Sequence, residues 1–257
     1  MGLPIIGIVG GVGPYAGLDL NRKIFDNTVT DGTDQDHLEV LLFSAGRQVP
    51  DRTEYLLRKA GENPAEQLFR AVETLARAGA RIMAIACNTA HAPEIITPLK
   101  EKILSLGLEI ELVDMIEETA LFIKENFGKG AKAGLLATEG TISAGVYDRL
   151  REERLGRIEL LLPSREIQKL VHQAIYDRKY GIKACSNPVT ERAVKECRLA
   201  VRHLAEQGAE TVILGCTELP LALPQSSIEG ASLLDPTWIT ARALVARVAL
   251  EKLKPWP

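Results

Sequence analysis

The stretch AVETLARAGARIMAIACNT, residues 71–89, is a helix-forming segment that passes through Gly79 into an apolar, strand-like segment and reaches Cys87 at its end. The pattern recurs 129 residues further along as AVRHLAEQGAETVILGCTE, residues 200–218, with seven identical positions and no gap. Any two helix–strand units share some Ala, Leu and Gly, because these residues are common. Here the cysteine near the end, Cys87 or Cys216, coincides as well, so we interpret the pair as an internal duplication.

The composition of the chain is that of a soluble globular protein. Its 257 residues are 46% hydrophobic and 25% charged, with a net charge of -3, which lacks the basic excess typical of nucleic-acid binding. No apolar run approaches the roughly 18 residues needed to span a membrane, and no basic segment precedes the first apolar stretch, as a secretory signal would require. The four cysteines have no zinc-site spacing. We therefore expect a cytoplasmic protein in a reducing compartment, with no metal, nucleic-acid or membrane partner.

Short apolar runs alternate with segments of helical period, which predicts an α/β protein with parallel sheets. The expected strands are residues 5–9, 40–43, 82–86, 110–113, 133–136, 160–162 and 211–214. The expected helices are residues 16–28, 64–78, 93–105, 116–126, 165–178, 189–206 and 236–253. Together with the duplication, this order favours two similar domains that face each other across a pseudo-two-fold axis.

The two repeated cysteines suggest a chemistry. Ligands of parallel α/β sheets bind at the carboxyl ends of the strands, where Cys87 and Cys216 are expected, and the polar residues after each cysteine offer backbone amides that can hold a carboxylate. Inverting a carbon next to a carboxylate requires a base on one face and an acid on the other. A thiolate paired with a thiol supplies both, so this pattern favours a racemase-type site.

Other interpretations of the cysteines exist. A single buried cysteine is commonly a structural residue, and a single catalytic cysteine needs an activating base such as histidine. His91 lies four residues after Cys87, but Pro220 stands at the matching position after Cys216. The symmetry favours two thiols of equal rank, and we expect His91 to orient the loop of Cys87.

The motifs ACNTAH and GCTE, together with GIVGGVGP, QVPDRT (residues 48–53) and GLLATEGTI (residues 134–142), resemble the aspartate/glutamate racemase superfamily, most of all its aspartate racemases. The resemblance extends over nearly the whole chain, up to LLDPT at residues 233–237. It implies two similar Rossmann-like domains with the active site in the cleft between them. It also implies racemisation without pyridoxal phosphate or metal. We expect the first domain to comprise residues 1–113 and 229–257, and the second residues 114–228.

The same resemblance implies the roles of individual residues. Cys87 and Cys216 would be the two proton donors and acceptors, and Arg52 and Lys183 would bind the carboxylates, with Lys179 as an alternative to Lys183. The remaining substrate-binding candidates are Asn88, Thr89, Ala90, Thr141, Thr217 and Glu218. Glutamate racemases carry an Asp-Ser pair in the first glycine loop and a histidine at the position of Glu218, so these differences point away from that enzyme.

The function expected from the sequence is therefore cofactor-independent racemisation of a small dicarboxylic amino acid, L-aspartate first and glutamate second, by a homodimer like that of many relatives. Three alternatives remain open: a maleate isomerase, a broad-specificity amino-acid racemase, and a carboxylate-binding module without catalytic activity. Formation of fumarate from maleate would identify the first, and stoichiometric binding without turnover would identify the last.

Overall fold

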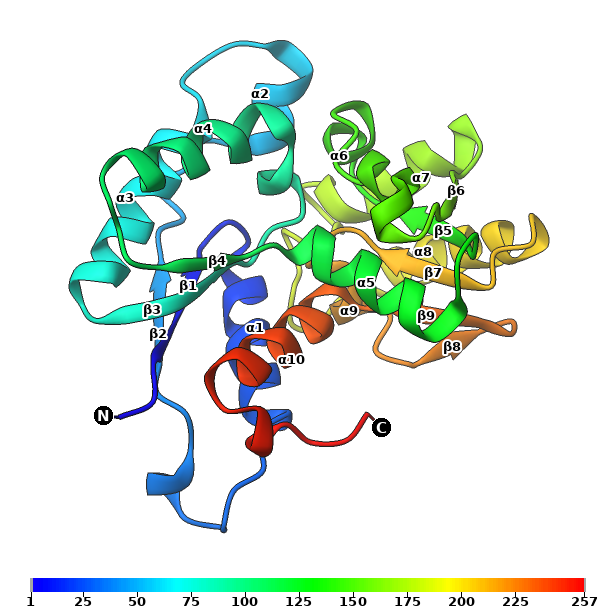
Figure 1. The fold of residues 1–257 in the computed structure, drawn as a ribbon. Helices are drawn as coiled ribbons and strands as arrows, with labels where there is room; N and C mark the ends of the chain where they lie inside the picture. Colours follow the sequence, from blue (N-terminus) through cyan, green and yellow to red (C-terminus); the bar gives the residue numbers. More distant parts are fainter. Residues whose placement is uncertain (1, 257) are drawn as a thin grey trace.

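The computed structural model describes residues 2–256 and contains two α/β lobes, each built on its own sheet (Figure 1). The first sheet has the order β2-β1-β3-β4, and the second has the order β6-β5-β7-β9-β8. The strands are β1 Ile5–Gly10, β2 Val40–Ser44, β3 Ala80–Ile85, β4 Glu111–Val113, β5 Lys132–Leu136, β6 Glu159–Leu161, β7 Thr211–Leu214, β8 Ser227–Ile228 and β9 Ala231–Leu234. Every strand pair is parallel except β8 with β9.

The two sheets repeat one strand order. In each sheet the first strand lies between the second and the third, and a fourth strand lies outside the third. The third strands, β3 and β7, belong to the two copies of the repeated sequence stretch. The predicted α/β class with two parallel sheets is confirmed.

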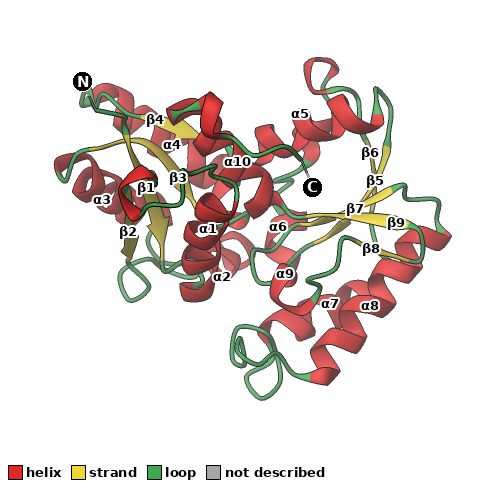
Figure 2. Ribbon diagram, turned by 90° about the horizontal axis from the view of Figure 1, so that it is seen from below, coloured by secondary structure: helices red, strands yellow, loops and turns green. Residues whose placement is uncertain are grey.

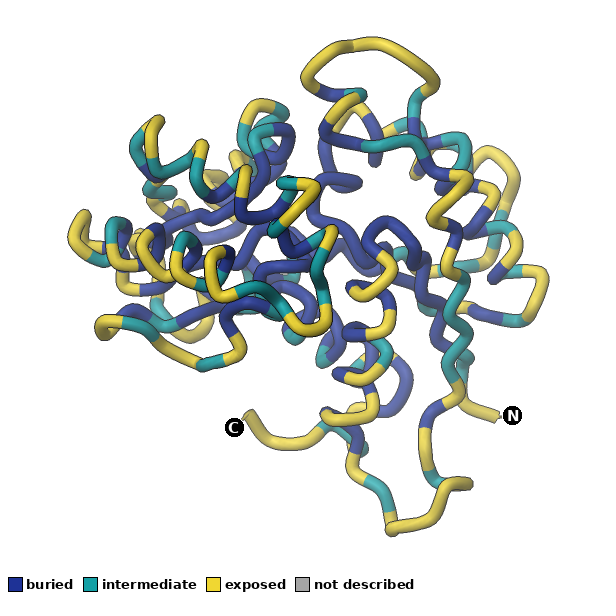
Figure 3. Tube along the Cα trace, turned by 180° about the vertical axis from the view of Figure 1, so that it is seen from behind, coloured by how far each residue is buried: buried dark blue, intermediate teal, exposed yellow. Residues whose placement is uncertain are grey.

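Helices cover both faces of the first sheet (Figure 2). The helices are α1 Pro14–Asp26, α2 Arg52–Arg58, α3 Pro64–Arg77, α4 Pro93–Ser105, α5 Met115–Phe127, α6 Glu139–Ser143, α7 Arg165–Tyr176, α8 Glu191–Glu206, α9 Leu219–Ala222 and α10 Pro236–Val248. In β1, Ile6 and Ile8 pack into the core formed with α1 and α10, whereas Val9 packs into the core that includes α3 and α4. This alternation leaves the strands buried on both faces, as parallel sheets require, and Figure 3 shows them as the dark interior of the molecule.

The chain crosses between the lobes twice. After β4, α5 joins a core cluster with Ala133 and Leu135 of the second sheet. After β9, α10 returns to contact α1 and the strands of the first sheet. Asp114 and Asp235 accept hydrogen bonds from the first backbone amides of α5 and α10 and so cap the two crossing helices.

The structure corrects the second domain boundary. The sequence pattern places residues 229–234 in the first domain, but Ala231–Leu234 form β9, which pairs with β7 in the second sheet. This strand has only four residues and its partner β8 has two, so neither produces a readable alternation of apolar and polar residues. The short helices α2, α6 and α9 are likewise absent from the expected elements. Within residues 2–256, no helix is both long and apolar enough to cross a membrane.

Candidate active site

The two repeated cysteines meet at one cavity between the lobes. Cys87 follows β3 by two residues, Cys216 follows β7 by two, and both side chains are buried. Both line a cavity of about 10 Å³, a volume that holds about one water molecule. The other lining residues are Val12, Arg52, Asn88, Thr89, Thr138, Tyr176, Lys183, Thr217 and Glu218. The site is therefore nearly closed and polar.

Arg52 is the first residue of α2, and its side chain lines the cavity together with Cys87. The preceding Asp51 caps this helix by accepting a hydrogen bond from the amide of Glu54 (2.8 Å). The buried guanidinium donates from Nη2 to the carbonyl of Val12 (2.9 Å), while its Nε has no hydrogen-bond partner. Burial lowers the pKa of Arg52, but its negative neighbours outweigh this effect and the net pKa is raised. A permanent cation with one unsatisfied donor thus lines the same cavity as Cys87.

Cys216 belongs to a hydrogen-bonded cluster centred on Glu218. The Cys216 thiol donates to Glu218 Oε2 (3.0 Å), and the hydroxyl of Thr217 donates to the same oxygen (3.3 Å). Lys183 Nζ donates to the other oxygen, Oε1, at 2.7 Å. The ammonium group of Lys183 also lies 5.3 Å from the ring centre of Tyr176. The cation of the second lobe is therefore already paired with an anion.

The charges of this cluster shift the pKa values of its members. Burial and then the Glu218 carboxylate raise the pKa of the Cys216 thiol well above its ordinary value. Burial raises the pKa of Glu218, but Lys183 and the bond from Cys216 outweigh it, so that the net pKa is lowered. Burial lowers the pKa of Lys183, but Glu218 more than offsets it and the net pKa is raised. At physiological pH the cluster is a neutral thiol beside a carboxylate–ammonium pair.

Asn88, directly after the first cysteine, contributes another unsatisfied donor. Its Oδ1 accepts a hydrogen bond from the hydroxyl of Tyr147 (2.5 Å), which fixes the side-chain amide. Its Nδ2 is buried and has no partner. Buried donors are nearly always satisfied in folded proteins, so an unsatisfied amide that lines the cavity suits a ligand that accepts hydrogen bonds.

Four threonines connect the two lobes, and two of them, Thr89 and Thr138, line the cavity. The hydroxyl of Thr53 lies 3.3 Å from that of Thr138, which lies 3.0 Å from Thr141, which in turn lies 2.8 Å from Thr89. Thr53 and Thr89 belong to the first lobe, and Thr138 and Thr141 to the second. All four hydroxyls are buried, so this chain of contacts fixes how closely α2 and α6 approach each other.

Gly140 permits that approach, because a Cβ there would lie 2.8 Å from the Cα of Thr53. We expect Gly140→Ala to push the lobes apart and to lower the melting temperature by about 2–10 °C, since overpacking typically costs about 1–3 kcal/mol. Activity should fall as well. Thermal unfolding followed by circular dichroism measures the effect, with the exposed Ser143→Ala on the same helix as the control. A wild-type melting temperature for Gly140→Ala would contradict this account of the lobe contact.

His91 contacts the backbone of the Cys87 loop, as the sequence predicts. Its Nδ1 lies 2.9 Å from the carbonyl oxygen of Cys87. Burial lowers the pKa of the imidazole below its ordinary value, so the ring is neutral at physiological pH. His91 is not among the residues that line the cavity, and its contact holds the loop in place.

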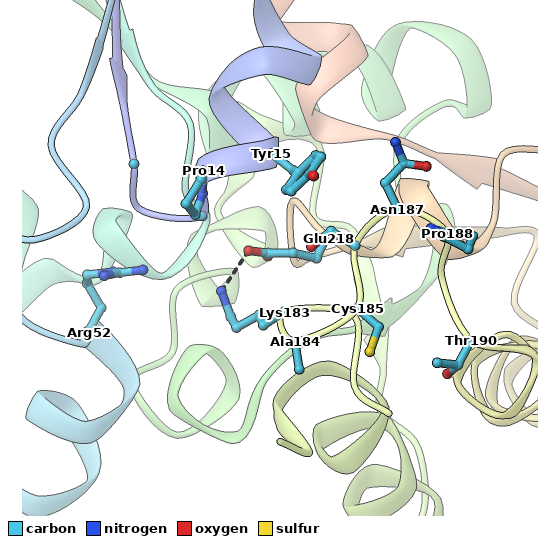
Figure 4. A pocket seen from close by; sticks show the side chains of 13 residues that line it. Pro14, Tyr15, Arg52, Lys183, Ala184, Cys185, Asn187, Pro188, Thr190 and Glu218 are labelled. Carbon is cyan, nitrogen blue, oxygen red and sulfur yellow. Dashed lines mark hydrogen bonds and ion pairs between the residues drawn. The ribbon is translucent and has the colours of Figure 1, made fainter. Parts of the chain in front are cut away.

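A larger pocket of about 700 Å³ adjoins the small cavity and shares Arg52, Lys183 and Glu218 with it. Figure 4 shows Arg52 at one side of this pocket and the Lys183–Glu218 pair at its centre. Tyr15, at the start of α1, lies on the opposite side of the pair from Ala184. The pocket therefore connects the polar cluster with the outside of the protein.

Most of the candidate residues from the sequence gather at the cavity, and three do not line it. Arg52, Cys87, Asn88, Thr89, Lys183, Cys216, Thr217 and Glu218 line it. Thr141 contacts it through Thr89 and Thr138, Ala90 is buried, and the exposed Lys179 donates its backbone amide to Asp177. Of the two candidate lysines, Lys183 lies at the cavity and Lys179 does not.

Sequence reasoning missed several residues at the site. Val12, Thr138 and Tyr176 line the cavity, Thr53 joins the threonine chain, and Tyr147 fixes Asn88. Valine, threonine and tyrosine occur throughout the sequence, so their type alone does not indicate a site. Only Thr138 has a local signal, because its side chain caps the short helix α6. Among the residues that the structure describes, no three His, Cys, Asp or Glu side chains are grouped so as to hold a metal ion.

Fold and site together define a two-lobed α/β protein with one thiol from each lobe in a shared cavity. The sequence profile of the Asp/Glu/Hydantoin racemase family matches residues 9–244. The chain belongs to this family of isomerases, which confirms the resemblance seen in the motifs.

Individual relatives agree with this assignment. The structure of an aspartate racemase from Picrophilus torridus superposes with a TM-score of 0.75 at 24% identity, and the match covers 95% of this chain and 94% of the other. An aspartate racemase homologue from Pyrococcus horikoshii OT3 gives a TM-score of 0.70 at 25% identity, over 96% of this chain and all of the other. A glutamate racemase from Shewanella woodyi is 27% identical over 217 residues, which are 79% of this chain and 73% of the other.

Proposed function

We propose that the protein racemises aspartate without an added cofactor, with Cys87 and Cys216 as the two acid–base groups. One observation carries the proposal: thiols from the two lobes line the same cavity. Racemisation needs a base on one face of the α-carbon and an acid on the other, and this arrangement provides one group for each.

The charges around the thiols support a dicarboxylate as the substrate. Arg52 provides a cation from the first lobe, and Lys183 provides from the second an ammonium group that is paired with Glu218 but has further donors. An arginine fork matches the geometry of a carboxylate. The unsatisfied Nε of Arg52 and Nδ2 of Asn88 are donors that a bound carboxylate would satisfy. A side-chain carboxylate at one cation and an α-carboxylate near the other would place the α-carbon between the two thiols.

The substrate must enlarge the cavity in order to bind. A space of about 10 Å³ holds about one water, much less than an amino acid requires. The adjoining pocket of about 700 Å³ is the route in, and the lobes must separate to admit the ligand. Closure around the substrate would then exclude water, which strengthens the electrostatic interactions with the developing carbanion.

Aspartate is the first substrate to test because the structural relatives include aspartate racemases and because the cavity is small. Glutamate is the second, because the curated relatives include glutamate racemases. The two differ by one methylene, which is worth about 1–3 kcal/mol of discrimination in a pocket.

The proposal predicts loss of optical rotation when the reduced protein is incubated with L-aspartate in deuterated water. Deuterium should appear at the α-carbon of the D-aspartate formed, because the donated proton comes from a thiol in exchange with solvent. Chiral chromatography with mass spectrometry measures both. L-glutamate and maleate serve as parallel substrates. If rotation and the α-proton persist with both amino acids, the protein is not a racemase of acidic amino acids, and conversion of maleate to fumarate would instead identify a maleate isomerase.

A further inference from the structure

The two thiols have different hydrogen-bond partners. The Cys216 thiol donates to Glu218 Oε2 over 3.0 Å, whereas among the described residues no carboxylate accepts a hydrogen bond from Cys87, which shares its cavity with the guanidinium of Arg52. A carboxylate stabilises a neighbouring thiol relative to its thiolate, and a cation has the opposite effect. The duplicated strand ends therefore hold their cysteines in electrostatically different surroundings, although the sequence repeat suggests that the two are equal.

Glu218 is held in place on several sides. One carboxylate oxygen accepts from Lys183 (2.7 Å), and the other accepts from Thr217 (3.3 Å) as well as from Cys216. The glycine loop of the first lobe covers it, because a Cβ at Gly13 would lie 2.3 Å from Oε1. The carboxylate cannot turn away from the thiol without breaking these contacts.

The other titratable groups near Cys216 are two tyrosines and one lysine. Burial raises the pKa of Tyr147 and of Tyr176, so both are neutral hydroxyls at physiological pH. The positive charge of Lys183 partly offsets the carboxylate, but only Glu218 accepts the hydrogen bond of the thiol. Arg52 lines the same cavity, and its positive charge acts on Glu218 as well as on Cys87.

We propose that Glu218 is the positioning residue that keeps the proton on Cys216 in the resting protein, so that Cys87 is the base and Cys216 is the acid in the first turnover. The inference rests on the proposed function for its catalytic meaning. The Cys87 thiolate removes the α-proton of one enantiomer, and the electron pair remains on the α-carbon, conjugated with the carboxylate. The Cys216 thiol then gives its proton to the opposite face of that carbon.

After this turnover the protons are exchanged: Cys87 is a thiol and Cys216 is a thiolate beside Glu218. That state is disfavoured, so Cys216 gains a proton from solvent and Cys87 loses one to it. Two enantiomers are equally populated at equilibrium, so kcat/KM must be the same in both directions. A difference between the reactions of L- and D-aspartate therefore appears in kcat and in KM, each compared separately between the two enantiomers.

The test measures the thiols directly and does not depend on turnover. Wild-type protein and Glu218→Gln are treated with iodoacetamide over a range of pH, and the alkylation rate of each cysteine is followed by peptide mass spectrometry. Cys87 and Cys216 share one cavity, so opening of the lobes affects both rates alike and their ratio reports the thiolate fractions. The partly exposed Cys185 and the fully buried Cys197 are the internal references.

In the wild-type protein we expect Cys87 to be alkylated at lower pH than Cys216. Glu218→Gln keeps the shape of the side chain and removes its charge. The pH profile for alkylation of Cys216 should then move to lower pH by one unit or more. At a pH below the midpoint of the profile, Cys216 should therefore be alkylated about tenfold faster than in the wild-type protein. Equal profiles in the wild-type protein, or an unchanged Cys216 profile in Glu218→Gln, would overturn the assignment.

Glu218→Asp provides the conservative comparison, because it keeps the carboxylate charge but moves it away from the Cys216 thiol. The pH profile for alkylation of Cys216 in this variant should lie between those of the wild-type protein and Glu218→Gln. Circular dichroism shows whether each variant is folded, and the wild-type profiles test the proposal even if both variants fail to fold. Racemisation of aspartate is assayed on the same samples. Unequal thiols without racemisation would refute the proposed function alone, and racemisation with equal thiols would refute only the role of Glu218.

Discussion

Cys87→Ser and Cys216→Ser are each expected to reduce the rate of aspartate racemisation by about 10²- to 10⁴-fold, the usual contribution of one acid–base group. A serine hydroxyl holds its proton far more tightly than a thiol. Neither variant can therefore remove a proton from one face of the α-carbon and add a proton to the other face. Both thiols line the cavity, and inversion needs a group on each face, so both variants should lose racemisation. Chiral chromatography of the product measures the loss.

The two variants should differ in what they retain. Each still has one thiol, which can remove the α-proton of one enantiomer and return a deuteron to the same face. In deuterated water we expect Cys87→Ser to label one enantiomer of aspartate without inversion, and Cys216→Ser to label the other. Labelling by Cys87→Ser should be the slower of the two, because its remaining thiol, Cys216, is held protonated by Glu218. Cys197→Ala removes a buried thiol of α8 away from the site and should keep wild-type turnover. Near-normal racemisation by either serine variant would exclude the two-thiol mechanism.

Much of the fold follows from local sequence patterns. The repeated stretch at residues 71–89 and 200–218 predicts a helix, a strand and a cysteine at the strand end, and the structure contains α3 with β3 and α8 with β7. Such units can be predicted from the sequence because the apolar periodicity, the helix cap and the glycine after the helix indicate the same helix and strand boundaries.

The composition of the site depends on contacts that no local pattern encodes. Glu218 meets Lys183 across 35 residues of sequence and Gly13 across the two lobes. The sequence therefore suggests Glu218 as one of several polar residues near a cysteine, and only the folded chain places its carboxylate on the thiol of Cys216. The inequality of the two thiols is likewise a property of tertiary contacts, because the duplicated strands themselves are alike.

Arg52→Met is expected to lower kcat/KM for aspartate by about 10²- to 10³-fold, mainly through KM. Removing one partner of a buried, hydrogen-bonded charge pair typically costs about 2–5 kcal/mol. In the complex, Arg52 would be paired with a carboxylate of the substrate, and the variant leaves that carboxylate without its cation. The Nε of Arg52 is available for this pair because it has no acceptor in the protein. The dissociation constant of succinate, a dicarboxylate with no amino group, isolates binding from proton transfer and should rise by a similar factor.

Stability should respond differently from activity. Burying the guanidinium of Arg52 costs desolvation, whereas losing its bonds to the carbonyls of Val12 and Pro50 costs hydrogen bonds. These contributions oppose each other, so we expect the free energy of unfolding to change by no more than about 1–2 kcal/mol. Arg52→Lys keeps the charge without the fork and should restore part of the affinity, and Arg58→Met, on the exposed side of the same helix, should change neither property. An unchanged succinate affinity in Arg52→Met would mean that Arg52 acts on Cys87 alone, and that the carboxylate is bound elsewhere.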